Sequence, residues 1–276
     1  RDAELFASRF IELGHEVVSF DFRGEPFGSG YDLTLHLEHI EPRHLEHAPR
    51  NWYMPNAEWH MEGARAALEA GRFERVLCKT PQAHRLFAPM TSGAVFVGFE
   101  SRDRFIPDVP RERAFLHAPG QSGFRGTPAV LGAFEGGDVG ASLVLPRAMP
   151  DGEYQREQNR CLFHLCPSEL EGWGHGIHEA LSVGAIVVTT DAPPMSEVDG
   201  TAYRIATSQR DPFRLVERMM VDKKGVGAAL KWCLGLGPEE IASLRARARA
   251  AFLAEREDFR ARFAALVNEE EAACVA

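Results

Sequence analysis

The chain has 276 residues, enough for one large domain or two modest ones, and its 45% hydrophobic and 26% charged residues are typical of a globular protein. The formal net charge of −9 argues against a nucleic-acid-binding protein, which usually carries a basic excess. No apolar run approaches the ~18 residues of a membrane span. The five cysteines are odd in number and form no C-x-x-C pair, so we expect reduced thiols and a cytoplasmic location.

The first part of the chain alternates helical and strand patterns. Apolar residues at helical spacing predict helices at 2–13, 62–70 and 81–87. Strands are predicted at 16–22, 31–40, 75–78 and 94–99, with a short extended piece at 52–55. A doubly wound domain normally opens with a strand, so the leading helix suggests that residues are missing before Arg1.

A second series follows a proline-containing stretch at 104–113, which predicts domains at 1–110 and 111–276. Its strands are predicted at 114–117, 141–145, 161–166 and 186–190. Its helices are predicted at 127–134, 151–159, from about 175, and at 212–220, 226–234 and 238–270. The passage between strand and helix near 146–150 is short enough that a segment is expected to be missing there. The fold class is therefore α/β, with parallel sheets covered on both faces.

The segment Glu171 to Glu179 (EGWGHGIHE) carries the most specific signal. Glycines let the backbone approach a ligand closely, and the N-terminus of the helix that opens near His175 suits a diphosphate. Glu179 can accept hydrogen bonds from ribose hydroxyls, and Glu171 from the hydroxyls of a sugar. The alternative is a strand–turn–helix with glycines for packing alone. The spacing differs from G-x-G-x-x-G, so a dinucleotide site is not expected.

This segment, preceded by C-P-S and followed by GAIVVTTDAPPMSE, resembles the E-x7-E signature of retaining glycosyltransferases of the GT-B fold, family 4. The resemblance implies two doubly wound, Rossmann-like domains facing each other across a cleft. It also implies that Glu171 contacts the transferred sugar and Glu179 the donor ribose. Amides around Trp173, Gly174, His175 and Gly176 are implied to meet the diphosphate or the donor sugar.

The loop from His117 to Thr127 (HAPGQSGFRGT) follows the first strand of the second series. A glycine turn at Gly120, the hydroxyl of Ser122 and the charge of Arg125 suit a diphosphate, and His117 can approach its phosphates. In the resembled family this place carries two cations. Arg125 matches the second, whereas Gln121 or Ser122 stands at the first. A surface-loop role for Arg125 is the alternative.

Two segments of the first domain are predicted to face the acceptor. Asn56, Glu58 and Trp59 follow one strand, and Lys79 and Thr80 follow the next. Carboxyl ends of parallel strands are where open α/β sheets place ligands. Similar P-N-x-E-W and C-K-T segments occur in a subset of the resembled family. Alternatively, Trp59 and Trp52 belong to the core.

The histidines at 36, 39, 44 and 47 only loosely suggest a metal site, since their spacing is not H-E-x-x-H, and no metal or other cofactor is expected. The resemblance to the glycosyltransferase family implies a metal-independent, retaining enzyme of the hexosyltransferase type. Its donor is expected to be a nucleotide-diphosphate sugar, with UDP or GDP as the nucleotide. The acceptor is an unidentified glycan, lipid-linked sugar or small molecule. Peripheral contact with the inner face of a membrane is the most that is expected. The alternatives are another GT-B enzyme, such as a nucleotide-sugar epimerase, and a non-catalytic nucleotide-sugar-binding module.

Overall fold

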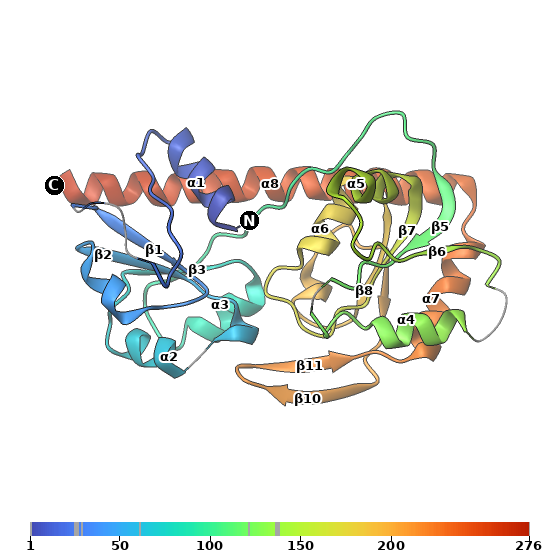
Figure 1. Ribbon diagram of the computed structural model, residues 1–276, viewed down its shortest axis with the longest axis horizontal. Helices are drawn as coiled ribbons and strands as arrows, with labels where there is room; N and C mark the ends of the chain where they lie inside the picture. Colours follow the sequence, from blue (N-terminus) through green and yellow to red (C-terminus); the bar gives the residue numbers. More distant parts are fainter. Residues whose placement is uncertain are drawn as a thin grey trace. The chain divides into compact units, whose positions relative to one another are not determined.

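The computed structural model describes residues 2–24, 28, 30–60, 62–120, 122–135 and 139–275, without the side chains at 62–63 and 270–275 (Figure 1). The chain divides into two compact units. Unit 1 comprises Arg1–Glu100 and Glu257–Ala276, and unit 2 comprises Ser101–Arg256. The boundary predicted at 110/111 lies ten residues further along the chain than this division, and no sequence pattern indicates that the end of the last helix belongs to the first unit.

Unit 1 contains a parallel four-stranded sheet in the order β1-β2-β3-β4. Its strands are β1 (Leu33–Leu37), β2 (Arg50–Met54), β3 (Arg75–Cys78) and β4 (Ala94–Phe96). Its helices are α1 (Asp2–Glu12), α2 (Glu62–Glu69) and α3 (Pro81–Phe87), with two 3-10 turns, η1 (Pro42–Glu46) and η2 (Ala57–Trp59). Helix α1 forms over the residues whose apolar spacing predicts it.

An aromatic cluster joins α1 to the last part of α8 (Pro238–Val275) within unit 1. The ring of Phe6 stacks on Phe99 at 5.1 Å and lies 5.4 Å from Phe263. Phe259 completes the cluster at 5.4 Å from Phe99. All four side chains are at most 2% exposed. Burying several aromatic side chains together contributes several kcal/mol, which explains why the helix end belongs to unit 1.

The predicted strand at 16–22 is wrong, because the structure assigns no strand to these residues. Two of their aromatic side chains contact histidine rings, whereas Val18 is exposed. Phe22 stacks on His39 at 4.8 Å, and Phe20 lies edge-on to His44 at 5.1 Å. His44 also bonds through Nε2 to the carbonyl oxygen of Phe22 at 2.9 Å. The histidine-rich stretch therefore anchors this segment.

Unit 2 contains a parallel five-stranded sheet in the order β6-β5-β7-β8-β9. Its strands are β5 (Glu112–Leu116), β6 (Leu143–Val144), β7 (Cys161–Cys166), β8 (Ile186–Thr190) and β9 (Tyr203–Ile205). Its helices are α4 (Thr127–Phe134), α5 (Asp151–Arg160), α6 (His175–Ser182), α7 (Lys223–Gly235) and the first part of α8, with the 3-10 turn η3 (Met195–Glu197). Residues 145–150 connect β6 directly to α5.

Both faces of the unit 2 sheet are covered, as the continuous apolar strands predict. Ile186 and Val188 of β8 pack in one core cluster with Val130 of α4 and Leu230 of α7. The intervening Val187 packs in a second cluster with residues of α6 and α8. Alternate side chains of β8 therefore pack against two different helical layers, one on each face of the sheet. This is the doubly wound arrangement.

The helix predicted at 212–220 is also wrong. These residues belong to an antiparallel hairpin of β10 (Gln209–Phe213) and β11 (Val216–Met220), drawn in orange in Figure 1. Phe213 pairs with Val216, so the turn is two residues long, and Arg214 has a φ of 52°. Pro212 lacks the N–H that a helix interior needs but is tolerated in an edge strand.

Candidate functional site

The strand order of unit 2 reverses at β5, which lies between β6 and β7. The helices that follow β5 and β7, α4 and α6, therefore lie on opposite faces of the sheet. Ligands of open α/β sheets bind at such a switch point. The loop after β5 contains Gly120 and Arg125, and the loop after β7 contains Ser168 and Glu171.

These two loops are in direct contact at Gly126. The backbone N–H of Glu169 donates to the carbonyl oxygen of Phe124 at 2.8 Å. Gly126 has a φ of 66°, and a Cβ atom on it would lie 2.3 Å from the carbonyl oxygen of Pro167. A side chain is excluded here by both the backbone conformation and the available space. The glycine thus allows Arg125 to approach the end of β7.

Arg125, Ser168 and Glu171 form one polar cluster. Arg125 Nη1 is paired with Glu171 Oε1, and the same carboxylate oxygen accepts a hydrogen bond from Ser168 Oγ at 2.7 Å. Arg125 Nη1 also donates to Ser168 Oγ at 3.3 Å. The side chain of Glu171 is 7% exposed and that of Arg125 is 30% exposed. The structure therefore brings together the two residues predicted to be catalytic, and adds a serine that holds both.

Helix α6 begins at His175, three residues after Gly172. Gly174 occupies the N-cap in the left-handed conformation with a φ of 88° and provides no side-chain cap. A helix of eight residues carries about half a positive charge at this end, and its first amides have no partner within the helix. His175 and Gly176 form this first turn. The geometry is suited to an anionic ligand, as predicted.

Trp173 and His175 are fixed by Ser101, a residue that the sequence analysis missed. Trp173 Nε1 donates to Ser101 Oγ at 3.2 Å, and the same oxygen lies 2.7 Å from His175 Nδ1. Ser101 is 3% exposed and Trp173 is 6% exposed. The indole of Trp173 stacks on His178 at 3.9 Å, and His178 Nε2 pairs with Glu255 Oε2 at 3.0 Å. No local sequence signal identified Ser101, because it lies more than 70 residues from its partners.

Glu179 is in the second turn of α6 and is 5% exposed. Its Oε2 accepts a hydrogen bond from Gln158 Nε2 of α5 at 3.3 Å. Gln158 in turn accepts from Arg104 Nε at 3.0 Å. The carboxylate is thus oriented by a buried amide.

His117 has a structural role in this unit. Its Nδ1 donates to the carbonyl oxygen of Leu165 at 2.9 Å, so Nε2 accepts from the hydroxyl of Thr127 at 2.8 Å. The ring is 1% exposed. Burial, and to a lesser degree the charge of Arg125, lowers the pKa of His117 below its usual value. A neutral imidazole therefore joins β5, β7 and α4.

The remaining predicted donor residues shape the loop. Ser122 Oγ accepts from the backbone N–H of Phe124 at 3.2 Å. Gly120 has a φ of 60°, and a Cβ atom on it would lie 3.7 Å from Arg125 Nε. Gln121, which with Ser122 is a candidate for the position where the resembled family carries its first cation, lies outside the described residues.

The hairpin supports the same loops. Arg218 of β11 forms an ion pair with Glu169 at 2.6 Å, and its guanidinium lies 5.2 Å from the centroid of the Phe124 ring. The backbone N–H of Met219 donates to the carbonyl oxygen of Glu169 at 2.9 Å. Phe213 of β10 contacts Phe124 at 5.4 Å.

In unit 1, the carboxyl ends of β1, β2 and β3 form a polar network. Lys79 Nζ donates to Asp2 Oδ2 at 2.6 Å and to Asn56 Oδ1 at 3.0 Å, although Lys79 is only 2% exposed. Asn56 Nδ2 donates to Glu38, which has a φ of 62°. Among the predicted acceptor residues, the structure therefore joins Asn56 to Lys79 and adds Glu38, which the sequence analysis did not single out.

The other predicted acceptor residues have different surroundings. Thr80 Oγ1 accepts from the backbone N–H of Ala83 at 3.0 Å and caps α3. Glu58 is 6% exposed, whereas Trp59 is 39% exposed and therefore not a core residue. Trp52, with 1% exposure, does belong to the core.

No group of three or more histidine, cysteine, aspartate or glutamate residues could hold a metal ion within the described ranges. Across those ranges, no helix combines the length and apolar character needed to cross a membrane.

No protein-family model and no curated protein sequence matches the chain. Solved structures do match. The pneumococcal O-GlcNAc transferase GtfA, in complex with UDP and GlcNAc, has a TM-score of 0.58 at 13% identity, with 80% of this chain and 52% of that chain covered. HepE from Anabaena, in complex with UDP and glucose, has a TM-score of 0.61 at 12% identity, with 80% and 72% covered.

A glycosyltransferase from Rickettsia africae has a TM-score of 0.63 at 10% identity, with 97% of this chain and 80% of that chain covered. The chain thus spans most of the Rickettsia protein but only about half of the pneumococcal one. At these identities the similarity establishes the fold. Together with the two parallel-sheet units, these matches show that the chain has the GT-B fold.

Proposed function

We propose that the chain is a retaining glycosyltransferase that moves a hexose from a nucleotide-diphosphate sugar to an acceptor hydroxyl without a metal ion. The observation that carries this proposal is the Arg125–Ser168–Glu171 cluster beside the N-terminus of α6, at the switch point of unit 2. UDP is the favoured nucleotide, because two of the structures similar to this chain contain it, and GDP is the second candidate.

In the proposed donor complex, the diphosphate binds the first amides of α6 and the guanidinium of Arg125. Arg125 is already paired with Glu171, so it must be shared with the phosphates. The carboxylate oxygens of Glu171 can then accept hydrogen bonds from the hydroxyls of the transferred sugar. Ser168 keeps Glu171 in place through its remaining hydrogen bond. Glu179, oriented by Gln158, binds the ribose hydroxyls.

The chemistry requires stabilisation of the negative charge that develops on the leaving diphosphate. Arg125 and the α6 amides supply fixed positive charge there, and such groups are typically worth ~10²–10³-fold in rate. The acceptor hydroxyl attacks from the face that the diphosphate leaves, and the leaving phosphate takes its proton. No protein base is obligatory in this scheme.

Unit 1 is proposed to bind the acceptor. Asn56 and Lys79 lie at the carboxyl ends of β2 and β3, which is the edge where open α/β sheets bind ligands. The exposed indole of Trp59 offers an apolar face for a sugar ring. Glu58 is the remaining polar candidate on this side.

The test is a release assay. Nucleotide release from UDP-, GDP- and TDP-sugars is measured with and without a chelator, and the anomeric configuration of the released or transferred sugar is followed by NMR. We expect slow hydrolysis of one donor, unchanged by the chelator, with retained configuration. Glu171→Gln and Arg125→Gln should each lower the rate by ~10²-fold, whereas Glu217→Gln, an exposed carboxylate of the hairpin, should leave it unchanged.

The outcomes separate the parts of the proposal. If no nucleotide sugar is bound or hydrolysed, the proposed function is wrong. Formation of a different nucleotide sugar without an acceptor indicates an epimerase. Binding without any turnover, unaffected by acceptors, indicates a non-catalytic module. An inverted product contradicts retention, and loss of activity with the chelator contradicts metal independence.

A further inference from the structure

Three arginines converge on the carboxyl end of α6, at the opposite end of the helix from the proposed diphosphate site. Arg249 Nη1 donates to the carbonyl oxygen of Ser182 at 2.6 Å, and Arg245 Nε donates to that of Gly184 at 3.3 Å. Arg111, which precedes β5, donates to the carbonyl oxygen of Val183. Cations at a helix C-terminus are favourable, so each of these bonds is understandable by itself.

The positive charge at this place exceeds what the described groups compensate. Three guanidiniums carry three positive charges, and the end of α6 offers about half a negative charge. Asp103 supplies one carboxylate, but it is held by Arg249 at 2.7 and 2.8 Å and lies 3.5 Å from Arg256. Within the described residues, neither Arg111 nor Arg245 forms an ion pair with a carboxylate. Burial first, and then the charge of Arg245, lowers the pKa of Arg111 to about 10.

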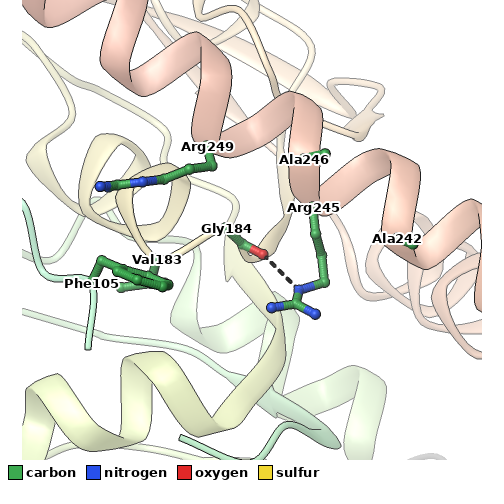
Figure 2. A pocket seen from close by; sticks show the side chains of 7 residues that line it. All are labelled: Phe105, Val183, Gly184, Ala242, Arg245, Ala246 and Arg249. Carbon is green, nitrogen blue, oxygen red and sulfur yellow. Dashed lines mark hydrogen bonds between the residues drawn. The ribbon is translucent and has the colours of Figure 1, made fainter. Parts of the chain in front are cut away.

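Arg245 and Arg249 line a cavity of about 300 Å³. Figure 2 shows Arg245 and Arg249 extending from α8, with Ala242 and Ala246 on the same helix and Phe105 beside Val183. Phe105 is 45% exposed, which is unusual for a large apolar side chain, and the guanidinium of Arg249 lies 5.0 Å from its ring centroid. The cavity thus combines an apolar wall with a cation, Arg245, that has no carboxylate partner among the described residues.

We propose that this cavity binds a small organic anion, a carboxylate or phosphate monoester attached to an apolar ring or short chain. Its charged group pairs with Arg245, and the potential of Arg111 adds to the attraction. Its apolar part contacts Phe105, Ala242 and Ala246. The volume fits a molecule of one or two rings, at the lower end of ordinary ligand sites.

The cavity is separate from the proposed donor site. It lies at the last turn of α6, whereas the Arg125–Ser168–Glu171 cluster lies near the first turn. An eight-residue helix is about 12 Å long, so both ligands can be bound at once. The proposal therefore stands independently of the proposed function.

Fluorescence titration with 1-naphthyl phosphate tests the proposal, with uncharged 1-naphthol as the matched ligand. Naphthyl phosphate should bind at least tenfold more tightly than naphthol, and the difference should shrink at high salt. Arg245→Gln, which keeps a donor for Gly184, should weaken binding by roughly tenfold. Arg247→Gln, on the same helix but bonded to Thr201 outside the cavity, should change nothing.

A second pair of variants tests the location without changing charge. Ala246→Phe fills the cavity and should abolish binding, whereas Ala250→Phe, at another exposed position one turn further along α8 that does not line the cavity, should not. Thermal unfolding of each variant confirms that it is folded. Equal binding by wild type, Arg245→Gln and Ala246→Phe overturns the proposal, as does competition between naphthyl phosphate and UDP. A third outcome also overturns the proposal: the protein binds anionic phospholipid vesicles but not naphthyl phosphate, and Arg245→Gln abolishes the vesicle binding. This outcome would indicate that the arginines bind a lipid surface and not a small molecule.

Discussion

Replacing Gly126 by alanine should displace the loop that carries Arg125. Two costs add at this position. An L-residue in the left-handed conformation costs about 1–2 kcal/mol, partly offset by about 0.4–1 kcal/mol from the stiffer unfolded chain. The new Cβ atom would also lie 2.3 Å from the carbonyl oxygen of Pro167, where backbone must move because no flexible side chain can yield. Overpacking of this kind adds about 1–3 kcal/mol.

Gly120→Ala is the matched control. Its φ of 60° is close to the 66° of Gly126, but its nearest neighbour is the flexible side chain of Arg125 at 3.7 Å. It should therefore show the backbone cost alone, about 1 kcal/mol. Gly126→Ala should lower the free energy of unfolding of unit 2 by about 2–4 kcal/mol in total.

Urea unfolding measures both variants, and calorimetric titration with UDP measures the consequence for the site. We expect Gly126→Ala to lose most UDP affinity and Gly120→Ala to retain more of it. If the two variants are destabilised equally, the loops after β5 and β7 do not approach each other as closely as the geometry of Gly126 and Pro167 requires, and the reasoning is refuted.

Three further predictions concern buried polar groups. Ser101→Ala should weaken UDP binding by roughly tenfold in calorimetry with little loss of secondary structure, because the contacts of Ser101 Oγ with His175 and Trp173 are lost; unchanged affinity would contradict that role. Lys79→Met should lower the free energy of unfolding by at least about 2 kcal/mol while UDP affinity stays unchanged, since Lys79 lies in unit 1. Burial lowers the pKa of His164 to about 3, so its unfolded form is protonated below pH 6.5 while its folded form stays neutral, and stability falls as the pH falls. Between pH 7 and pH 5 this one group should lower the free energy of unfolding, measured with urea, by about 2 kcal/mol. If the free energy of unfolding of His164→Gln depends on pH as steeply as that of the wild type, this role of His164 is contradicted.

Much of the fold of this chain follows from local patterns. The structure confirms β3, β7 and β8 over the residues predicted, because each is a short apolar run bounded by turn residues. It likewise confirms α3 and α4, each of which begins with a proline in its first turn. These elements are the ones whose sequence pattern and tertiary environment agree.

Two predicted elements are wrong because tertiary contacts override the local sequence pattern. Residues 16–22 have the alternation of a strand, but Phe20 and Phe22 are covered by His44 and His39 rather than by a strand. The stretch 212–220 has apolar residues at helical spacing, yet Phe213 packs on Phe124 and the chain turns at Arg214. Neither outcome can be inferred from a window of neighbouring residues.

The same division holds for the candidate site. The glycines and acids at 171–179 are contiguous, so their relation to a helix N-terminus was predictable. The pairing of Arg125 with Glu171 depends on two loops brought together by strand order, and the roles of Ser101 and Ser168 depend on contacts across that arrangement. The charged residues of the site are therefore recognisable from the sequence, whereas the contacts between them are not.

The central claim is that Arg125 and the first turn of α6 hold the diphosphate of a nucleotide sugar. Calorimetric affinities for UDP and UMP, measured for wild type and Arg125→Gln, test it directly, because the two ligands differ only in the second phosphate. The account predicts that the wild type prefers UDP by at least roughly tenfold and that the variant loses most of this preference. An unchanged preference in Arg125→Gln, or the absence of nucleotide binding in the wild type, would contradict it.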